Sequence, residues 1–583
     1  MTEPDRDTPE TAADEPTPRP RLSWKLDGGI ALGLVLLLML VLLPTTHHYG
    51  MTYDEGWYGG TAIRAREWVG YLFSNPARAL SREVVLKQWS ASGVGEGGTK
   101  MEEQQPGAPK LIDGVLGYWV SMITGARPEE RSGTALFTAG CVAALYLVLA
   151  SVWGRGAGIF AVFALVSMPR VFVHAHLAAL DVPVMATSFV SVALMFAAVA
   201  RRSTWLAVLS GLAWGIAMAC KINAVFVPMI LTAWILWLHR DFALRAALSL
   251  VGGGIVSFFL SWPWLWYDTI PHLSRYFAFH LRHYQVGVSY FGHISGQQPW
   301  HYPTVMTIIT TPPVTLLLGI AGAVIAVSHL RKPKADEGDG MVPWQRSLSA
   351  LLLIGAVLSI GFNSLSSAPK YGGVRLFMPF FVYLAALAGV AFHAISERIA
   401  RALPEALGGS LTPVRVRVLL AVLVLVPAVR ATLDTHPYQM SYYNAFIGGL
   451  PGAAERGMEA TYWGDTYGAA IKLFFDALGP DDIVWVDLPG CEWIARTTLP
   501  LGFRPDQLCS GGVPPPEATW AVVQNKVTEL RPESKALIAA GPPAATISLH
   551  GVVLSYVFDQ AGVQRGLALL EKLEPGEEAS IGD

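Results

Sequence analysis

The stretch LDGGIALGLVLLLMLVLLP, residues Leu26–Pro44, decides the fold class of this chain. A helix needs about 20 apolar residues to cross a hydrocarbon core about 30 Å thick, and this run has that length. No small-residue cleavage site follows the run, which indicates a permanent anchor and not a removed signal peptide. Residues 1–25 are polar and rich in proline, and this composition predicts a disordered tail.

Apolar runs of similar length recur along the chain. Of its 583 residues, 52% are hydrophobic and 15% are charged, whereas soluble proteins carry about 25% charged residues. This composition excludes a disordered chain, a coiled coil and an ordinary soluble enzyme. Further runs lie near residues 136–153, 157–173, 182–200, 204–220, 222–239, 244–265, 304–328, 347–363, 376–396 and 416–433. We therefore expect a polytopic α-helical membrane protein with about eleven spans in residues 26–433.

Residues 434–583 differ from this membrane part in composition. They contain 19 acidic and 9 basic residues, whereas the preceding part contains 25 acidic and 33 basic residues. Ala469–Leu478 has a helical pattern, and three runs have the residue types of strands: Asp482–Val486, Trp520–Gln524 and Ile547–Tyr556. We therefore expect a small water-soluble α/β domain after the last span. Its Trp463–Tyr467 cluster suits either contact with a substrate or packing.

The orientation of the spans follows from Lys and Arg, which accumulate in cytoplasmic loops. With the N-terminus in the cytoplasm, the inner loops carry a large set of basic residues: Arg155, Arg201, Arg202, Arg240, Arg245, Arg331, Lys332, Lys334, Arg346, Arg398, Arg401, Arg415 and Arg417. An odd number of spans then places the α/β domain outside the inner (plasma) membrane. Leu111–Thr124 is apolar but short, so we expect it to lie on the outer surface as a juxtamembrane helix.

The polar residues of the membrane part gather at the outer end of the predicted spans. They lie in or beside the outer loops 45–135, 174–181, 266–303 and 364–375. A transporter or proton pump usually places its charges at mid-depth instead. This clustering predicts an active site at the outer boundary between membrane and water.

The chemistry that suits this boundary is transfer from a lipid carrier. A polyprenyl phosphate keeps its tail in the bilayer and its phosphate at the level of the headgroups. Cations at that level stabilise a leaving phosphate, and a carboxylate can take the proton of an acceptor hydroxyl. The sequence contains no P-loop and no Gly-rich dinucleotide motif, which fits a lipid-linked donor.

Thr52-Tyr53-Asp54-Glu55, directly after the first span, resembles the Asp-Glu motif of the protein O-mannosyltransferase (PMT) family, glycosyltransferase family 39. The segment 105–110 (QPGAPK) stands where that family has a His-Pro-Pro-Leu-x-Lys-like segment, but it lacks the His. Further similar segments are 170–181 (RVFVHAHLAALD), 211–221, 299–303 (PWHYP), 370–375 (KYGGVR) and 436–444. The resemblance covers roughly residues 26–475 and implies the C-type glycosyltransferase (GT-C) fold.

The resemblance also implies roles for the matching residues. Asp54 is expected as the general base, and Glu55 as an acid that places the acceptor or orders the loop. Lys221, Arg375 and Arg131 are expected to bind the donor phosphate, although Lys and Arg near span ends often only reach toward lipid headgroups. The secondary candidates are Asp181, His174, His176, Arg170, Lys110, Lys370 and His301.

No cofactor is firmly implied. Asp181 and His174 carry atoms that zinc or manganese accept, so a divalent metal is the alternative to the hydrogen-bonding role that we favour for them. Cys491 and Cys509 lie in the predicted outer domain. A disulfide between them is expected because that compartment is oxidising.

The sequence therefore predicts an integral membrane glycosyltransferase that uses a polyprenyl-phosphate sugar donor. The expected acceptor is a hydroxyl of a protein Ser or Thr or of an envelope glycan, and the expected outcome is inversion at the anomeric carbon. The alternative within this fold is a transferase that modifies lipopolysaccharide, lipid A or a cell-wall glycan. A transporter or flippase is the alternative from another class, and a non-catalytic binding or assembly protein is a third. Nothing in the bulk charge, a formal −2, suggests nucleic-acid binding.

Overall fold

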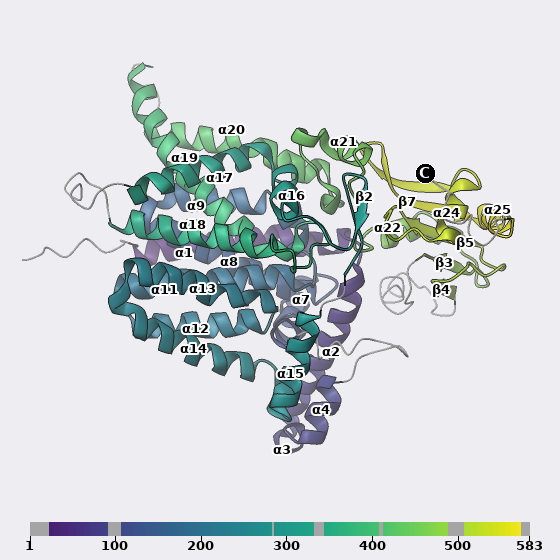
Figure 1. The fold of residues 1–583 in the computed structure, drawn as a ribbon, viewed down its shortest axis with the longest axis horizontal. Coiled ribbons are helices and arrows are strands. Elements are labelled where there is room, and N and C mark those ends of the chain that lie inside the picture. The colour runs from purple at the N-terminus through teal and green to yellow at the C-terminus, as the bar shows by residue number, and fades with distance from the viewer. Residues whose placement is uncertain are drawn as a thin grey trace, which may run out of the picture.

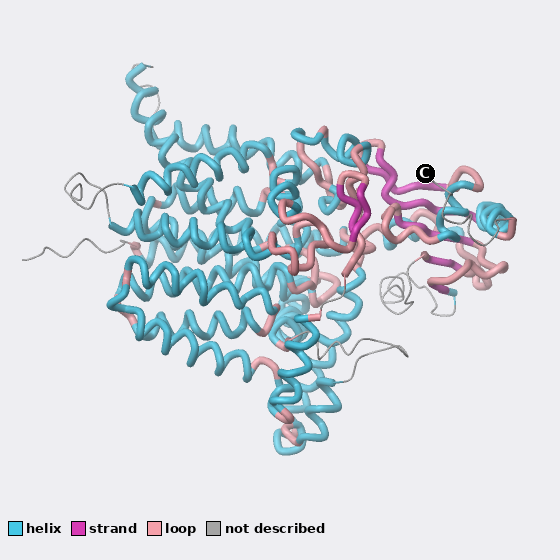
Figure 2. Tube along the Cα trace, viewed as in Figure 1, coloured by secondary structure: helices cyan, strands magenta, loops and turns pink. Residues whose placement is uncertain are grey.

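The fold is that of a computed structural model, which describes residues 22–90, 106–282, 285–331, 343–406, 412–487 and 507–572. A bundle of long helices forms the larger part of the molecule (Figure 1). The strands of the described residues lie at or beyond one end of this bundle (Figure 2). The expected combination of a polytopic helical part and a small α/β region is therefore confirmed.

Each of the predicted spans contains an apolar helix. Eight of the described helices are long and apolar enough to cross a membrane: α1 (Trp24–Thr45), α8 (Arg131–Trp153), α11 (Asp181–Arg201), α14 (Ala243–Leu260), α17 (Pro313–Arg331), α18 (Pro343–Asn363), α19 (Pro379–Ala406) and α20 (Pro413–Asp434). Three apolar helices are shorter: α9 (Arg155–Val166), α12 (Thr204–Met218) and α13 (Phe226–Leu238).

Proline breaks two of the predicted runs into separate helices. The run 304–328 contains α16 (Tyr302–Thr310) and α17, with Pro312 and Pro313 at their junction. The run 157–173 contains α9 and α10 (Pro169–His174), which begins at Pro169. Proline fits the first turn of a helix, where its missing N–H has no intrahelical partner, but it disrupts a helix interior.

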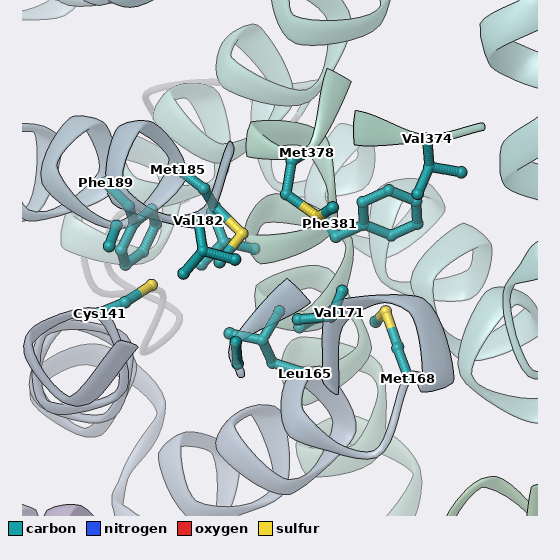
Figure 3. Close-up of a cluster of buried hydrophobic side chains, with 14 of the residues drawn as sticks. Cys141, Leu165, Met168, Val171, Val182, Met185, Phe189, Val374, Met378 and Phe381 are labelled. Atoms are coloured by element: carbon teal, nitrogen blue, oxygen red, sulfur yellow. The ribbon is translucent and has the colours of Figure 1, made fainter. Parts of the chain in front are cut away.

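The buried core of the bundle lies around α8, α11 and α19. Figure 3 shows apolar side chains that point toward one another there, among them Cys141, Val182, Met185, Met378 and Phe381. In contrast, α1 and α20 keep much of their apolar surface exposed. Helices that are apolar on every side suit a bilayer, because lipid covers the surface that the bundle leaves open.

Small residues bring α12 and α14 into close contact. A Cβ added to Gly215 would lie 2.0 Å from Ser257 Oγ and 2.2 Å from the carbonyl oxygen of Gly254. Packing of this kind drives helix association in membranes, where the hydrophobic effect between helices is absent. Because Lys221 follows α12 almost directly, the same packing positions a predicted site residue.

Short helices cover one end of the bundle, which we call the site end. It is the end where α1 finishes and α11 begins, and α2 (Tyr53–Ser74) runs across it (Figure 1). The other short elements there are α3 (Pro76–Ala79), α4 (Arg82–Ser90), α6 (Ala108–Leu111), a π-helical segment (Ile112–Gly117), α7 (Tyr118–Thr124) and α15 (Thr269–Leu281). The predicted juxtamembrane segment 111–124 is therefore helical and packs against α2 and α8.

The C-terminal region is a mixed five-stranded sheet with helices. The strand order is β4 (Leu508–Ser510), β3 (Val484–Val486), β5 (Trp520–Gln524), β7 (Val552–Asp559) and β6 (Ala545–Leu549). Its helices are α21 (Gly449–Glu455), α22 (Tyr467–Lys472), α24 (Pro532–Ala539) and α25 (Gln560–Leu570). A separate hairpin, β1 (Val288–Tyr290) and β2 (His293–Ser295), lies at the site end. The run 547–556, predicted as one strand, is a hairpin because His550 and Gly551 both have positive φ and reverse the chain.

We predict that Gly215→Ala destabilises the protein by about 1–3 kcal/mol, the usual cost of overpacking, because the added methyl group collides with α14. Gly252→Ala is the matched control, since a Cβ at Gly252 meets nothing within 4 Å. The measurement is the thermal midpoint of each variant in detergent. Equal midpoints would show that α12 and α14 are not in close contact.

Candidate active site

Four charged side chains from distant segments form a continuous chain at the site end. Arg375 Nη2 donates to Asp54 Oδ2 at 2.6 Å, and Arg375 Nε donates to Asp181 Oδ2 at 3.2 Å. Lys221 Nζ donates to the other oxygen of Asp181, Oδ1, at 2.6 Å. We call Asp54, Arg375, Asp181 and Lys221 the charge chain. Its members alternate in sign, so each charge has a neighbour of opposite sign.

The ends of helices position these four side chains. Asp54 lies in the first turn of α2 and Asp181 begins α11, and a carboxylate is favoured at both places by the helix dipole. Lys221 follows α12 in extended backbone, and Arg375 begins a short 3₁₀ helix, η7 (Arg375–Phe377), just before α19. The sequence order therefore brings no two of them together; the packing of the bundle does.

Burial increases along the charge chain from Asp54 toward Asp181. The side chain of Asp54 is 23% exposed and that of Arg375 is 9% exposed, whereas that of Asp181 is 1% exposed. A carboxylate buried this deeply is tolerated only when cations pair with it, and Asp181 has two. Asp181 thus anchors the charge chain, and Asp54 is the member that reaches toward water.

A cavity of about 530 Å³ opens beside Asp54 and Arg375, a volume typical of small-molecule sites. Its lining from the membrane part is Tyr53, Asp54, Val286, Tyr371, Gly372 and Arg375. Its lining from the C-terminal region is Tyr462, Trp463, Gly464, Asp487, Lys526, Thr528, Glu529, Leu530 and Arg531. The cavity therefore lies between the two parts of the protein, and the charge chain forms part of its wall.

Arg131 is held differently from the cations of the charge chain. Its Nε and Nη2 donate to Glu55 at 2.8 and 2.9 Å. Its Nη1 donates to the carbonyl oxygens of Thr46 and Tyr49, and its Nη2 also donates to that of Gly50. These contacts use all five N–H donors of the guanidinium.

Glu55 is equally occupied. It accepts from the backbone N–H of Thr52 at 2.9 Å, as a helix cap, and from that of Ala178 at 2.8 Å. Glu55 is 2% exposed and Arg131 is 1% exposed. The expected phosphate role of Arg131 does not fit this arrangement, because the guanidinium is buried and saturated. Of the two roles expected for Glu55, the arrangement favours ordering the loop over placing the acceptor. The geometry instead assigns them to holding the loop between α1 and α2 against α8 and the 174–181 loop.

Arg170 supports the loop that carries Arg375. Its Nε donates to the carbonyl oxygen of Tyr442 at 3.2 Å, and its guanidinium carbon lies 4.8 Å from the ring centroid of Tyr443. A Cβ added to Gly373 would lie 2.5 Å from Arg170 Nη1. Arg170 is 2% exposed, so it acts from beneath the loop and not from the cavity.

His174, the last residue of α10, and His176, in the loop before α11, are hydrogen-bonded to backbone. His174 Nδ1 pairs with the carbonyl oxygen of Arg170 at 2.6 Å, and His176 Nδ1 pairs with that of Phe172 at 2.8 Å. Burial lowers the pKa of His174 to about 4 and that of His176 to about 3, so both rings are neutral at pH 7. This agrees with the hydrogen-bonding role favoured from the sequence.

A metal site at Asp181 and His174 does not fit the geometry. Both oxygens of Asp181 already accept hydrogen bonds from cations, and a metal ion would add a further positive charge there. Among the residues that the structure describes, no group of three or more His, Cys, Asp or Glu is arranged to hold a metal ion.

The remaining candidates from the sequence lie in the surrounding loops. Lys370 Nζ donates to the carbonyl oxygens of Leu365 and Ala368 in its own loop. His301 Nδ1 pairs with Tyr290 OH of β1 at 3.0 Å. Lys110 is 4% exposed in α6, which packs against α2.

The predicted disulfide between Cys491 and Cys509 stays a prediction. Cys491 lies outside the residues that the structure describes.

Several residues that line the cavity were not singled out from the sequence, among them Asp487, Lys526 and Glu529. Asp487 directly follows β3 and Lys526 follows β5, and these two strands are parallel neighbours. Ligands of α/β proteins usually bind beyond the carboxyl ends of parallel strands, so this signal could have found them once the strands were known to be parallel. Sequence alone does not give that pairing.

Three carboxyl groups of the C-terminal region are buried at or near the cavity wall. Burial raises the pKa of Glu459, Asp465 and Asp487 to about 7 each. Asp487 accepts hydrogen bonds from Tyr467 OH and from the backbone N–H of Gln524, and Glu459 accepts one from Thr528 Oγ1. Near neutral pH each group is therefore divided between its protonated and charged forms.

These shifts predict that stability falls as pH rises from about 4 to about 7. In that window the folded protein still holds protons that the unfolded chain, with ordinary carboxyl pKa values, has already released. Each group then contributes a slope of up to about 1.4 kcal/mol per pH unit. The thermal midpoint from pH 5 to pH 8 measures this, and the midpoints of Asp465→Asn and Glu459→Gln should fall less than that of the wild type. Parallel curves for all three proteins would contradict the raised pKa values.

Comparison with known proteins supports the resemblance seen in the sequence. Residues 128–267 match a family model described as dolichyl-phosphate-mannose-protein mannosyltransferase. This range contains Arg131, Asp181 and Lys221. No curated protein sequence matches the chain.

Two kinds of solved structure are similar to the chain at low identity. ArnT from Cupriavidus metallidurans bound to undecaprenyl phosphate has 18% identity and a TM-score of 0.46, over 91% of this chain and 98% of that one. The archaeal oligosaccharyltransferase AglB from Archaeoglobus fulgidus, in complex with an inhibitory peptide and a dolichol-phosphate, has 11% identity and a TM-score of 0.42, over 86% of this chain and 70% of that one. The chain is thus similar over residues 128–267 to the dolichyl-phosphate-mannose-protein mannosyltransferase family, and the charge chain includes Asp181 and Lys221 from that range.

Proposed function

We propose that the protein transfers a sugar from a polyprenyl-phosphate donor to a hydroxyl of a protein or an envelope glycan. One observation carries this proposal: Arg375 links Asp54 to Asp181 and Lys221 at the wall of the cavity. A carboxylate that can act as a base and cations that can hold a phosphate are thus parts of a single hydrogen-bonded unit at the ends of the membrane helices.

Lys221 and Arg375 are the groups proposed to bind the lipid phosphate. Arg375 has five N–H donors, and its contacts with Asp54 and Asp181 leave capacity for a phosphate. A bound phosphate competes with Asp54 for the guanidinium because both are anions. Donor binding would therefore loosen the hold of Arg375 on Asp54 and make Asp54 available as a base.

A small apolar crevice of about 20 Å³ lies inside the bundle, enough for about one water molecule. It is lined mainly by α11, α13, α18 and α19, through Met185, Phe189, Phe226, Val227, Ile230, Val382 and Tyr383 among others. Its lining includes Asn223, two residues after Lys221, and Leu376, next to Arg375. Asn223 Nδ2 donates to the carbonyl oxygen of Leu376 at 3.0 Å. The crevice is too small for a polyprenyl tail, so we propose that the tail stays in the bilayer while its phosphate contacts Lys221 and Arg375.

The proposed reaction is a single displacement. Asp54 takes the proton of the acceptor hydroxyl as the acceptor oxygen forms a bond to the anomeric carbon. The bond between that carbon and the phosphate oxygen breaks, and the lipid phosphate keeps the electron pair. Lys221 and Arg375 stabilise the negative charge that develops on the phosphate. Attack from the face opposite the phosphate inverts the anomeric carbon.

The charges that line the cavity favour an uncharged acceptor. Asp54 and Glu529, together with Asp487 when it is ionised, stand against Arg375, Lys526 and Arg531, so the lining carries little net charge. Lys526 Nζ also pairs with Glu529 at 2.5 Å. A site for a phosphorylated acceptor such as lipid A would present an excess of positive charge. A protein Ser or Thr hydroxyl or a neutral glycan hydroxyl therefore suits this cavity better.

The position of the charges also favours an enzyme over a transporter. A transporter needs polar groups near the middle of its spans, along a pathway. The charge chain lies at the ends of α11 and α12 and beside the cavity, which suits catalysis at the membrane surface.

We propose that the site end faces away from the cytoplasm in the plasma membrane, because the opposite loops carry the basic residues. Reporter fusions after Thr124 and at Asp583 are expected to be active only outside the cytoplasm. A fusion after Arg202, on the opposite side, should give the reverse result and serves as the control. A cytoplasmic reporter at Asp583 would invert the proposed orientation.

The adjacent acids Asp54 and Glu55 give a matched pair of variants. Asp54→Asn removes the base and keeps its shape, so sugar transfer should fall by about 100- to 10,000-fold while the protein stays folded. Glu55→Gln breaks a buried ion pair and should cost about 3–5 kcal/mol of stability. Transfer is measured in membranes supplied with radiolabelled polyprenyl-phosphate sugars, and stability by the thermal midpoint.

Asp241→Asn is the control, since Asp241 pairs with Arg202 on the surface at the opposite end. It should keep both transfer and stability. Transfer by Asp54→Asn at the rate of the wild type would exclude Asp54 as the base.

A further inference from the structure

Trp463 of the C-terminal region covers Arg375. The ring centroid of Trp463 lies 3.7 Å from Arg375 Cζ, the contact distance of a cation stacked on an aromatic face. The carbonyl oxygen of Trp463 accepts a hydrogen bond at 2.8 Å from the backbone N–H of Tyr53, the residue before Asp54. One residue thus contacts Arg375 through its ring and the start of the helix that carries Asp54 through its backbone.

The backbone of Trp463 is held in a strained conformation. Its φ is +73°, in the left-handed region that bulky residues rarely adopt. Such strain persists only where the surroundings fix it. Gln524 of β5 does this, because its Oε1 accepts from the N–H of Gly464 at 3.2 Å and its Nε2 donates to Thr466 Oγ1 at 3.0 Å. We call residues 461–466 the Trp463 turn.

The Trp463 turn also packs against the loop between α1 and α2. A Cβ added to Gly50 would lie 1.9 Å from the carbonyl oxygen of Asp465, so the two backbones touch. Gly50 in turn accepts a hydrogen bond from Arg131 at 2.7 Å. The turn is therefore fixed on one side by the C-terminal sheet and on the other by the buried Arg131–Glu55 pair.

We propose that Trp463 is a positioning residue that holds the Arg375 guanidinium against the cavity wall, so that the C-terminal region completes the active site. This inference rests on the proposed function. When Asp54 takes a proton it loses its charge, and its ion pair with Arg375 weakens. The Trp463 ring carries no charge that titrates, so its contact with Arg375 persists through that step and, with Asp181, keeps the guanidinium in place.

The first test needs no substrate. Phenylglyoxal labels accessible arginine side chains, and peptide mass spectrometry reports the rate at Arg375 in the purified full-length protein. Trp463→Leu should raise that rate several-fold, whereas Trp463→Phe should not, because a ring remains over the guanidinium. The labelling rate at the exposed Arg78 is the internal reference within each protein. The control variant is Trp300→Leu, because Trp300 is 69% exposed.

The second test uses the transfer assay. Trp463→Leu should lower kcat by about 3- to 30-fold, which is the rate change that corresponds to the energy of a cation–π contact. Trp463→Phe should keep most of the wild-type kcat. In a protein that already carries Arg375→Lys, adding Trp463→Leu should lower kcat much less than it does in the wild type. The contact between the Trp463 ring and the guanidinium is already altered there. If Trp463 had a purely structural role, the fold-loss of kcat in the double variant would equal the product of the fold-losses in the two single variants.

The outcomes separate this inference from the proposed function. Unchanged labelling of Arg375 in Trp463→Leu would overturn the role of Trp463 whatever the reaction is. Multiplying losses in the double variant would overturn it as well. A wild-type protein that neither transfers sugar nor binds undecaprenyl phosphate would overturn the proposed function, and the labelling experiment would still decide whether Trp463 holds Arg375.

Discussion

The pairing of the Asp181 carboxylate with two cations is the interaction on which the site depends. A carboxylate that is 1% exposed costs several kcal/mol unless opposite charges compensate it. Lys221 and Arg375 both do so, and this requirement brings the start of α11, the end of α12 and the start of η7 to one point. Asp54 joins them through Arg375 and extends the unit into the cavity. The four charges of the charge chain therefore cancel and form one closely packed unit at the site end.

Two adjacent acids illustrate how burial divides structural from chemical roles. Glu55 is 2% exposed and shares Arg131 with backbone carbonyls, so its oxygens have no capacity for a substrate. The side chain of Asp54 is 23% exposed and lines the cavity. In the first turn of α2, the side chain of Glu55 therefore points into the protein and stabilises the loop, whereas that of Asp54 points into the cavity. The structural pair fixes the loop before α2, and through it the direction in which Asp54 points.

The C-terminal region contributes more than half of the residues that line the cavity, so it is part of the candidate site. Its contribution comes from the carboxyl ends of β3 and β5 and from the Trp463 turn. The turn connects the sheet to the membrane part at Tyr53 and Arg375. Because burial raises the pKa of Asp487, which lines the cavity, to about 7, the charge of this wall depends on pH in the physiological range.

The sequence by itself determined the membrane-spanning helices and the α/β region after them, and it proposed Asp54, Asp181, Lys221 and Arg375 within a larger set of site candidates. These follow from local signals, since apolar length, strand residues and polar residues at span ends can be read without knowing which helices are neighbours. Only the tertiary structure decided which charges meet. It assigned Arg131 to Glu55 and Arg375 to Asp54, and it brought Asp487, Lys526 and Trp463 to the cavity. Pairing depends on helix packing and strand order, and these bring together residues that are up to several hundred positions apart, so no local pattern records them.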